Sequence, residues 1–263
     1  MIVSGPGAVT AIDTLLGTIT LPAGGDWNIF GVFCQIVNAT PTPAQSISGY
    51  FRLYAATGDL VPNPAPSKFP FPHLGAMLGA TTDVVNCPLQ IIPVAYVAPG
   101  KAQIQIIIHQ DTTNTVAPQI VAGIIFGKTL PQDTAFVFVD QVRAAVTVAT
   151  EAAIGTITLA EKATLITGVC GMIAQNGVLV TLEELIGQFR LGSDDVKMAP
   201  SSWPFSAAYG AGLGALINQS QPCVPRFIPV HIPVQGGARI DCFCDLNTAV
   251  TNACEAQVYI KYQ

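Results

Sequence analysis

The chain carries little charge. Asp, Glu, Lys and Arg make up 10% of its 263 residues, against roughly 25% in a typical soluble domain. Only 11 residues are Lys or Arg, and the net charge is −5. Direct binding to nucleic acid needs clustered cations that neutralise phosphates, so we expect no direct nucleic-acid ligand. A surface this poor in charge has few ways to stay soluble and unattached. We therefore expect further copies of the chain to cover much of it.

Long apolar runs are also missing. Half of the residues are hydrophobic, yet no uninterrupted stretch reaches the roughly 18 residues of a membrane-spanning helix. We expect no transmembrane segment. Residues 1–13 contain neither a basic region nor a long apolar one, so no secretory signal is visible. This favours reduced thiols and assembly inside a cell, although the odd count of seven cysteines leaves an interchain disulfide open.

The sequence shows no catalytic set, and we expect neither an enzyme nor a cofactor. The three histidines, His73, His109 and His231, lie far apart and have no histidine counterparts in the other half of the chain. Cys242 and Cys244 alternate along a strand, which puts both sulfurs on one face, but no second pair sits at metal-ligand spacing. We therefore interpret them as packing residues, as we do Cys34 and Cys170. Oxygen ligands for a loop cation could come from Asp241, Asp245 and Asn247, which we interpret as polar strand ends.

The clearest feature that is present is an internal repeat. Residues 8–22 (AVTAIDTLLGTITLP) reappear as residues 145–160 (AVTVATEAAIGTITLA), and further matches follow in the same order at offsets between 134 and 138. Two copies of this length indicate a duplicated domain rather than a solenoid. We place the first domain at residues 1–131 and the second at residues 132–263. The matched positions include Phe51-Arg52-Leu53 with Phe189-Arg190-Leu191, Phe69-Pro70-Phe71 with Trp203-Pro204-Phe205, Cys87 with Cys223, and Ile92-Pro93-Val94 with Ile228-Pro229-Val230.

Several repeated positions are candidates for a role. Arg52 and Arg190 follow a phenylalanine at the same place in each copy. One hypothesis is a repeated salt bridge to an acid of a neighbouring subunit, which makes both arginines candidate assembly-interface residues. The alternative is an outward strand position beside an inward phenylalanine. We expect structural roles for the other repeated pairs, namely Cys87 and Cys223, Phe71 and Phe205, and Pro93 and Pro229.

The pattern predicts an all-β protein. Val, Ile, Thr and Phe are frequent, and Gly, Pro, Asn and Asp interrupt the chain at short intervals. Residues 151–166 have helical propensity at their edges, but their counterpart in the first copy contains Pro22 and the pair Gly24-Gly25, so we expect a strand there. Residues 136–140 are expected to enter the first strand of the second copy, and residues 180–189 are the best helical candidate. About eight short strands per copy fit two tandem antiparallel sandwiches of jelly-roll type better than immunoglobulin domains.

By this architecture, the whole chain resembles the double jelly-roll major capsid proteins of internal-membrane DNA viruses, such as corticoviruses and tectiviruses. The resemblance rests on two tandem eight-strand sandwiches, little charge and no catalytic set, and no diagnostic motif carries it. It implies a homotrimer whose six sandwiches form a pseudo-hexagonal tile of an icosahedral shell. It also implies a place in the virion, assembly in the host cytoplasm, and contacts with other capsid proteins such as a penton or minor protein.

Two other functions are compatible with the same features. A non-viral extracellular fibre or surface-layer subunit built of jelly rolls would also explain the low charge and the duplication. A carbohydrate-binding tandem sandwich would need an exposed aromatic platform in both copies. The repeated pairs Phe69 with Phe71 and Trp203 with Phe205 could supply one, although a hydrophobic plug at the end of a sandwich explains them more simply.

Overall fold

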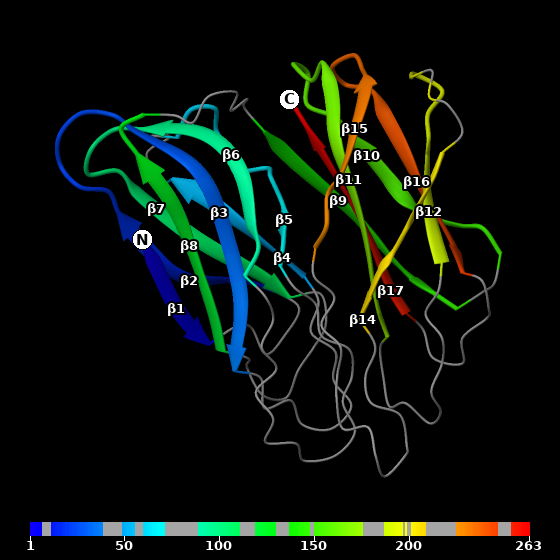
Figure 1. Ribbon diagram of the computed structural model, residues 1–263, viewed down its shortest axis with the longest axis horizontal. Coiled ribbons are helices and arrows are strands. Elements are labelled where there is room, and N and C mark those ends of the chain that lie inside the picture. The colour runs from blue at the N-terminus through cyan, green and yellow to red at the C-terminus, as the bar shows by residue number, and fades with distance from the viewer. Residues whose placement is uncertain are drawn as a thin grey trace, which may run out of the picture.

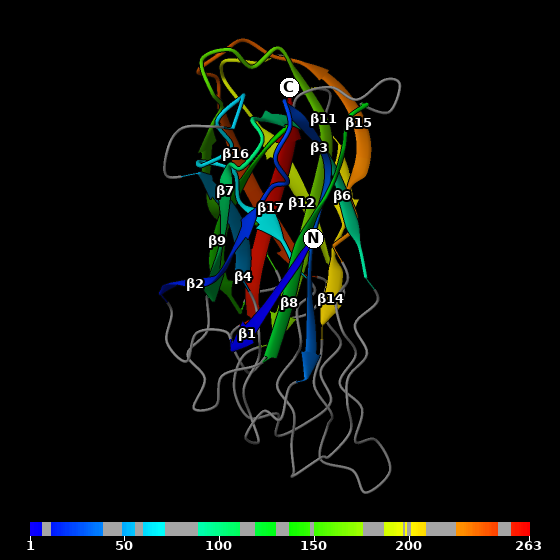
Figure 2. The same cartoon turned by 90° about the vertical axis from the view of Figure 1, so that its left-hand side faces the viewer.

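The computed structural model describes residues 1–6, 12–38, 49–55, 60–71, 89–110, 119–129, 137–147, 150–175, 187–196, 198, 201–208, 225–246 and 254–263. All regular elements in these ranges are β-strands. The described residues contain no helix of the length and apolarity needed to cross a membrane. The strands form two sandwiches that stand side by side (Figure 1). In the view turned by 90°, the long strands β3 (Trp27–Asn38), β8 (Gln119–Gly127) and β11 (Leu165–Gln175) run roughly upright (Figure 2). The predicted all-β class is confirmed.

The first sandwich is built from β3, β8 and six further strands: β1 (Ile2–Pro6), β2 (Asp13–Thr20), β4 (Gly49–Ala55), β5 (Phe69–Pro70), β6 (Ile91–Ala98) and β7 (Gln103–Gln110). Sheet A has the order β1-β8-β3-β6, and sheet B has the order β2-β7-β4-β5. All pairings in both sheets are antiparallel. Sheets A and B enclose one apolar core to which both contribute side chains.

The second sandwich is built from β11 and eight further strands: β9 (Phe138–Val146), β10 (Ala152–Thr158), β12 (Gly187–Gly192), β13 (Ser202–Pro204), β14 (Ser206–Ala208), β15 (Ile228–Pro233), β16 (Arg239–Leu246) and β17 (Cys254–Tyr262). Sheet C has the order β9-β17-β11-β15, and the short β14 lies parallel to the end of β11. Sheet D has the order β10-β16-β12-β13.

Both copies follow the same strand order. If β13 is counted as the fifth strand and β15 as the sixth, each sandwich pairs strands in the orders 1-8-3-6 and 2-7-4-5. This is the arrangement of an eight-stranded jelly roll. The internal packing repeats as well: the rings of Phe51 and Phe69 lie 5.4 Å apart, and those of Phe189 and Trp203 lie 5.5 Å apart. The predicted tandem jelly rolls are confirmed.

Helical propensity does not determine the structure of the segments that carry it. Residues 152–158 form β10 despite their helical propensity, and β9 begins at Phe138 inside the segment expected to open the second copy. Of the helical candidate 180–189, residues 180–186 lie outside the described residues, and 187–189 belong to β12. The boundary between residues 131 and 132 also lies outside them, between β8 and β9. It stays a prediction.

The described cysteines are buried: Cys34, Cys170, Cys242, Cys244 and Cys254. Cys34 lies in the core of the first sandwich, and Cys242, Cys244 and Cys254 lie in the core of the second, whereas Cys170 lies on the outer face of sheet C, against the first sandwich. At all five places the sulfur packs as a small apolar group. Burial raises the pKa of Cys170 and of Cys244 to about 12, and it also raises the pKa of Cys34 and Cys242. Because only the thiolate is a good nucleophile, these side chains are unreactive in the folded protein.

This gives a first prediction. At about pH 8, iodoacetamide should leave Cys34, Cys170, Cys242 and Cys244 unmodified in the folded protein and should modify all four after unfolding, since folding both buries the sulfurs and suppresses the thiolate. Peptide mass spectrometry of the two samples reads out each site. Rapid labelling of Cys242 in the folded protein would contradict a closed core in the second sandwich.

Candidate assembly surface

The repeated arginines each form an ion pair within the chain. Arg52, on β4, contacts Asp13 of β2. Arg190, on β12, donates to both carboxylate oxygens of Glu151, at 2.7 and 2.8 Å. Asp13 and Glu151 occupy matching places, each four residues before a glycine in the aligned repeat. The acid is thus duplicated together with the arginine. An alignment of the two copies shows this matching acid, so the pairing could have been inferred from the sequence.

The two ion pairs lie in different surroundings. Asp13 also lies 2.7 Å from Nδ1 of His109, whose ring stacks on Tyr50 at 4.7 Å. In the second copy the guanidinium of Arg190 lies 4.3 Å from the ring centroid of Phe243. Both arginines project outward, opposite an inward phenylalanine, as strand alternation requires. Of the two hypotheses for these arginines, one took the acid from a neighbouring subunit, whereas the chain itself supplies an acid to each. Contact of these arginines with a neighbour stays a prediction.

The repeated aromatic and proline positions have structural surroundings. Phe71 is fully buried in the first core, and Phe205 packs on Phe189 with ring centroids 5.4 Å apart. Pro93 and Pro229 are exposed residues of β6 and β15, in line with the absence of a backbone donor in proline, which suits such positions at a sheet edge. The remaining repeated pair, Cys87 and Cys223, lies outside the described residues.

The residues considered as metal ligands belong to β16. Cys242 and Cys244 share the inner face of sheet D and lie in the core of the second sandwich. Asp241 accepts a hydrogen bond from the Thr156 hydroxyl on the neighbouring strand, and Asp245 from the Gln188 side chain. In the part of the chain that the structure describes, no three His, Cys, Asp or Glu side chains gather as a metal site would require. Asn247 lies outside the described residues.

The outer face of sheet C packs against the first sandwich. The amide of Lys68 donates to the carbonyl oxygen of Val139 on β9 at 2.7 Å, and the Val139 amide donates to Oγ of Ser67 at 3.3 Å. The Tyr96 hydroxyl donates to the carbonyl oxygen of Val137 at 2.7 Å. The side chains of Val139 and Tyr259 belong to the core cluster of the first sandwich. As a result, β17 is buried on both faces from Cys254 to Ile260.

A polar cluster lies within this interface. The Tyr259 hydroxyl lies 2.9 Å from the carbonyl oxygen of Gly49 on β4 and 2.6 Å from Oε1 of Gln257. Nε2 of Gln141 donates to the same Oε1 at 2.9 Å and to the hydroxyl at 3.2 Å. All three side chains are buried. Buried polar groups are stable only when partnered, so this cluster ties the relative position of the two sandwiches to one set of hydrogen bonds.

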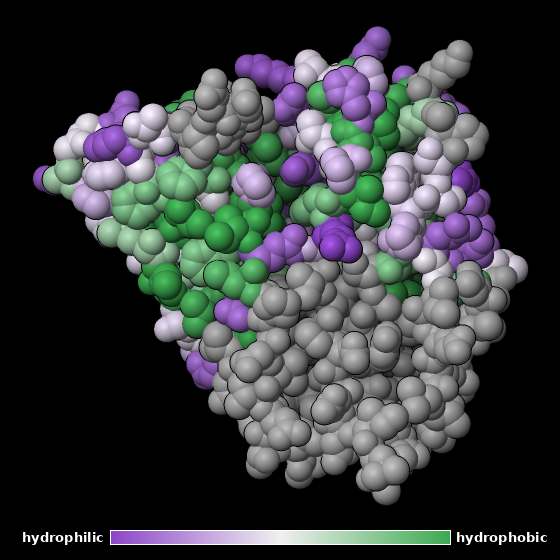
Figure 3. All heavy atoms as spheres, viewed as in Figure 1, coloured by the Kyte–Doolittle hydropathy of each residue, from purple (hydrophilic) through white to green (hydrophobic). Residues whose placement is uncertain are grey.

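The corresponding face of sheet A is open and apolar. The residue pairs Phe33 with Gly123 and Cys170 with Tyr259 occupy equivalent places, between the third and eighth strands of their copies. Tyr259 is fully buried by the first sandwich. In sheet A, Phe33 and Gly123 are also buried, whereas the large residues beside them, Ile2 and Ile91, are 65% and 46% exposed. Figure 3 shows this apolar surface over β3, β6 and β8. The described residues that face outward from these strands and from β1 are uncharged: Ile2, Ser4, Gly31, Phe33, Gln35, Ile91, Pro93, Val121, Gly123 and Ile125.

Two glycines shape this face. A Cβ on Gly31 would lie 2.9 Å from Cγ2 of Ile91, and a Cβ on Gly123 would lie 2.6 Å from the Phe33 ring. Such contacts are too short, so glycine at these two positions leaves the space that the Ile91 and Phe33 side chains occupy over the sheet. We define the outer face of sheet A as the apolar face.

The similarity of this chain to known proteins is low. No protein-family model and no curated protein matches the chain. Among solved structures, it is similar to the crystal structure of the STIV major capsid protein, at 9% identity and a TM-score of 0.35, over 100% of this chain and 96% of that one. It is also similar to a cryo-EM structure of T=1 Penaeus vannamei nodavirus, at 10% identity and a TM-score of 0.22, over 98% and 94%.

Because these scores are low, the assignment of the fold rests on the strand order of each copy. The chain is a double jelly roll. Two sandwiches follow one another along the chain, and both have the same pairing of strands. In this double jelly roll, the surface of greatest functional interest is the apolar face, since its equivalent in the second copy is already used for packing.

The interface within the double jelly roll gives a second prediction. Tyr259→Phe removes the hydroxyl shared by Gly49 and Gln257 and leaves buried polar groups short of a partner, so it should lower the free energy of unfolding by about 1–3 kcal/mol. Urea unfolding at fixed protein concentration measures the change. Tyr54→Phe, at an exposed tyrosine of β4, is the matched control and should have little effect. Equal stability of the two variants would contradict a structural role for the cluster.

The ion pair between Arg190 and Glu151 gives a third prediction. Hydrogen bonds from Arg190 hold the pKa of Glu151 below its ordinary value, so the pair stabilises the fold above the ordinary glutamate range and loses this effect as the pH falls through the lowered pKa. Glu151→Gln should therefore be slightly less stable than the parent at neutral pH. The difference in stability between the two proteins should disappear in acid. Thermal unfolding across a pH series tests this, and the exposed Glu161→Gln is the control. A difference in stability that grows in acid would refute a stabilising role for this ion pair.

Proposed function

We propose that this chain is the major capsid protein of a virus, a structural subunit that forms homotrimers and tiles an icosahedral shell. The observation that carries the proposal is the apolar face of the first sandwich, whose equivalent in the second sandwich is buried against a jelly roll. Three chains supply six similar sandwiches, which suits a pseudo-hexagonal tile. In such a subunit, the outer face of sheet C packs within the chain, and the equivalent face of sheet A is available to a neighbouring chain.

The energetics favour association through apolar contact. Stable obligate interfaces bury about 2,000 Å² or more in total. Apolar surface contributes about 25 cal/mol per Å² removed from water, whereas an exposed ion pair contributes at most about 1 kcal/mol. Because Arg52 and Arg190 already have acids within the chain, their net gain from a new partner is smaller still. Assembly therefore depends on the apolar face more than on the arginines.

The same features define the expected partners and location. The first partners are further copies of the chain, and other capsid proteins, such as a penton or minor protein, would complete a closed shell. The outward residues of the apolar face are uncharged, so that surface is unsuited to binding a genome directly. We place the assembled protein in the virion, with assembly in the host cytoplasm and no enzymatic role.

The two alternatives make different demands on the structure. A fibre or surface-layer subunit would use the same apolar face but would build filaments or open sheets. A carbohydrate-binding protein would need aromatic platforms in both copies, and Phe69 and Phe71 are fully buried. Trp203 is partly exposed, so only the second copy could offer a stacking surface. The tile-forming subunit accounts for both copies.

The mass of the assembled species is the fourth prediction. Size-exclusion chromatography with light scattering should give three times the 27.4 kDa of one chain, or larger shells, and negative-stain images of the same fractions should show hexagonal tiles or closed particles. Ile91→Asp puts a charge on the exposed part of the apolar face and should raise the dissociation constant of the assembly at least ~10-fold, with an unchanged circular dichroism spectrum.

Thr18→Asp is the matched control, because Thr18 is an exposed residue on the outer face of sheet B. It should assemble like the parent. Long filaments in the images would favour the fibre alternative. A parent chain that stays monomeric at high concentration would overturn the capsid proposal, and glycan binding would then be measured.

A further inference from the structure

Each sandwich has an opening at one edge, between the last strands of its two sheets. We call this opening the mouth. The mouth of the first sandwich lies between β5 and β6, and that of the second lies between β13 and β15. The strands are equivalent in the repeat, so the two mouths are built from matching residues. Their surroundings differ.

The first mouth is closed by sheet C. Phe69, Phe71 and Tyr96 are all fully buried there. Residues Val137 and Val139 lie across the opening and bond to its rim: the Tyr96 hydroxyl, the Lys68 amide and Oγ of Ser67 are their partners. The occupant of the first mouth is therefore the outer face of the sheet that begins the next sandwich.

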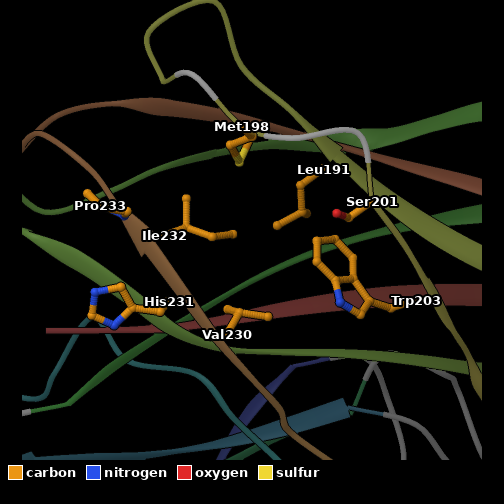
Figure 4. A pocket seen from close by; sticks show the side chains of 8 residues that line it. All are labelled: Leu191, Met198, Ser201, Trp203, Val230, His231, Ile232 and Pro233. Carbon is orange, nitrogen blue, oxygen red and sulfur yellow. The ribbon is translucent and has the colours of Figure 1, made fainter.

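The second mouth is open. It forms a pocket of about 380 Å³, and Figure 4 shows Trp203 of β13 on one side of it and Val230, His231 and Ile232 of β15 on the other. Trp203 and Ile232 are the counterparts of Phe69 and Tyr96, yet they are only partly buried. Six of the eight lining residues have apolar side chains, and Ser201 and His231 are polar: Leu191, Met198, Ser201, Trp203, Val230, His231, Ile232 and Pro233.

The rim of the mouth is repeated in the sequence. Residues 66–71 read PSKFPF, and residues 200–205 read PSSWPF. Ser201 is therefore the counterpart of Ser67, whose Oγ accepts the hydrogen bond from Val139. A serine at the same place in the open mouth presents the same acceptor. Sheet C docks on the first copy of this rim, and the second copy offers the same rim to a further sheet.

We infer that the mouth of the second sandwich binds the apolar face of a second copy of this chain. The inference rests on the proposed function in one respect, that the partner is another copy. Its structural basis is independent: among the described residues, one mouth is docked on one outer face, and the equivalent mouth and the equivalent face make no such contact. When the contact found within the chain is repeated between two chains, it joins these two surfaces.

The repeat also sets the register of the contact. Gly49, whose carbonyl oxygen lies beside Tyr259, has Gly187 as its counterpart, and Tyr259 has Gly123. The neighbour's Gly123 and the Phe33 ring above it therefore lie over Gly187. Phe227, which packs against the core of the first sandwich, has Ile91 as its counterpart, so the neighbour's Ile91 lies on the same mouth.

The contact is head-to-tail. A face and a mouth are different surfaces, so each chain offers one of each and a dimer leaves one of each unused. Heterologous contacts of this kind continue until they close into a ring or extend into a filament. Six sandwiches in a closed ring correspond to three chains, which connects the contact to the proposed trimer.

Mixing two variants tests the contact. Ile91→Asp damages only the apolar face, and Ser201→Arg places a long charged side chain only in the mouth. Each variant alone should be monomeric. An equimolar mixture should form a 1:1 heterodimer by light scattering and native mass spectrometry, since one intact mouth then meets one intact face. A mixture that stays monomeric, under conditions where the parent assembles, overturns the head-to-tail contact and leaves the proposed function standing.

Crosslinking locates the contact. A photoreactive p-benzoylphenylalanine at position 201 of the assembled protein should give crosslinks between chains that map to the strands of sheet A, within residues 1–6, 28–36, 89–97 or 119–127. The same group at position 18 should not reach those residues. Crosslinks from position 201 to any other surface refute the inference while assembly persists. A parent chain that never assembles refutes both the inference and the proposed function.

Discussion

Sheet C of this protein packs on both sides, and most of the architecture depends on that burial. One side of β17 faces the core of the second jelly roll, and the other contributes Tyr259 and Gln257 to the contact with the first. The polar groups in this contact are satisfied only in one relative position, because the Tyr259 hydroxyl must lie beside the Gly49 carbonyl. Two similar sandwiches thus become one body with a defined polarity. An apolar face remains at one end and an open mouth at the other.

The asymmetry between the two copies is more informative than their similarity. Phe51 with Phe69 and Phe189 with Trp203 form nearly the same aromatic contact, so the local chemistry of the two sandwiches is alike. Phe69 is nevertheless fully buried, whereas Trp203 lines a pocket. Residues that are equivalent in the repeat but differ in burial indicate where a further chain can dock. In a protein that lacks a repeat, the same pocket would carry no such indication of its occupant.

Charge plays a local part in this molecule. Arg190 pairs with Glu151, and Arg52 pairs with Asp13, and each pair spans the strand that lies between its two partners in the sheet. Such pairs organise the outer faces of sheets B and D and leave the apolar face without charge. In the proposed assembly, association through that face is governed by burial of apolar area, which is weakly specific by itself. The proposed contact would gain specificity from the fit of Phe33 and Ile91 over Gly123 and Gly31, and from the serine on the rim of each mouth.

The sequence alone determined the duplication, the all-β class, the jelly-roll type and the outward direction of Arg52 and Arg190, because strand alternation and repeated motifs are local properties. It also contained Asp13 and Glu151 at matching positions, although their pairing with the arginines became visible only in the folded sheets. The tertiary structure decided which outer face is covered and which mouth stays open. These depend on contacts such as that between Tyr259 and Gly49, which are 210 residues apart. A strand pattern defines two faces, and only the packing of distant segments decides which of them meets a neighbour.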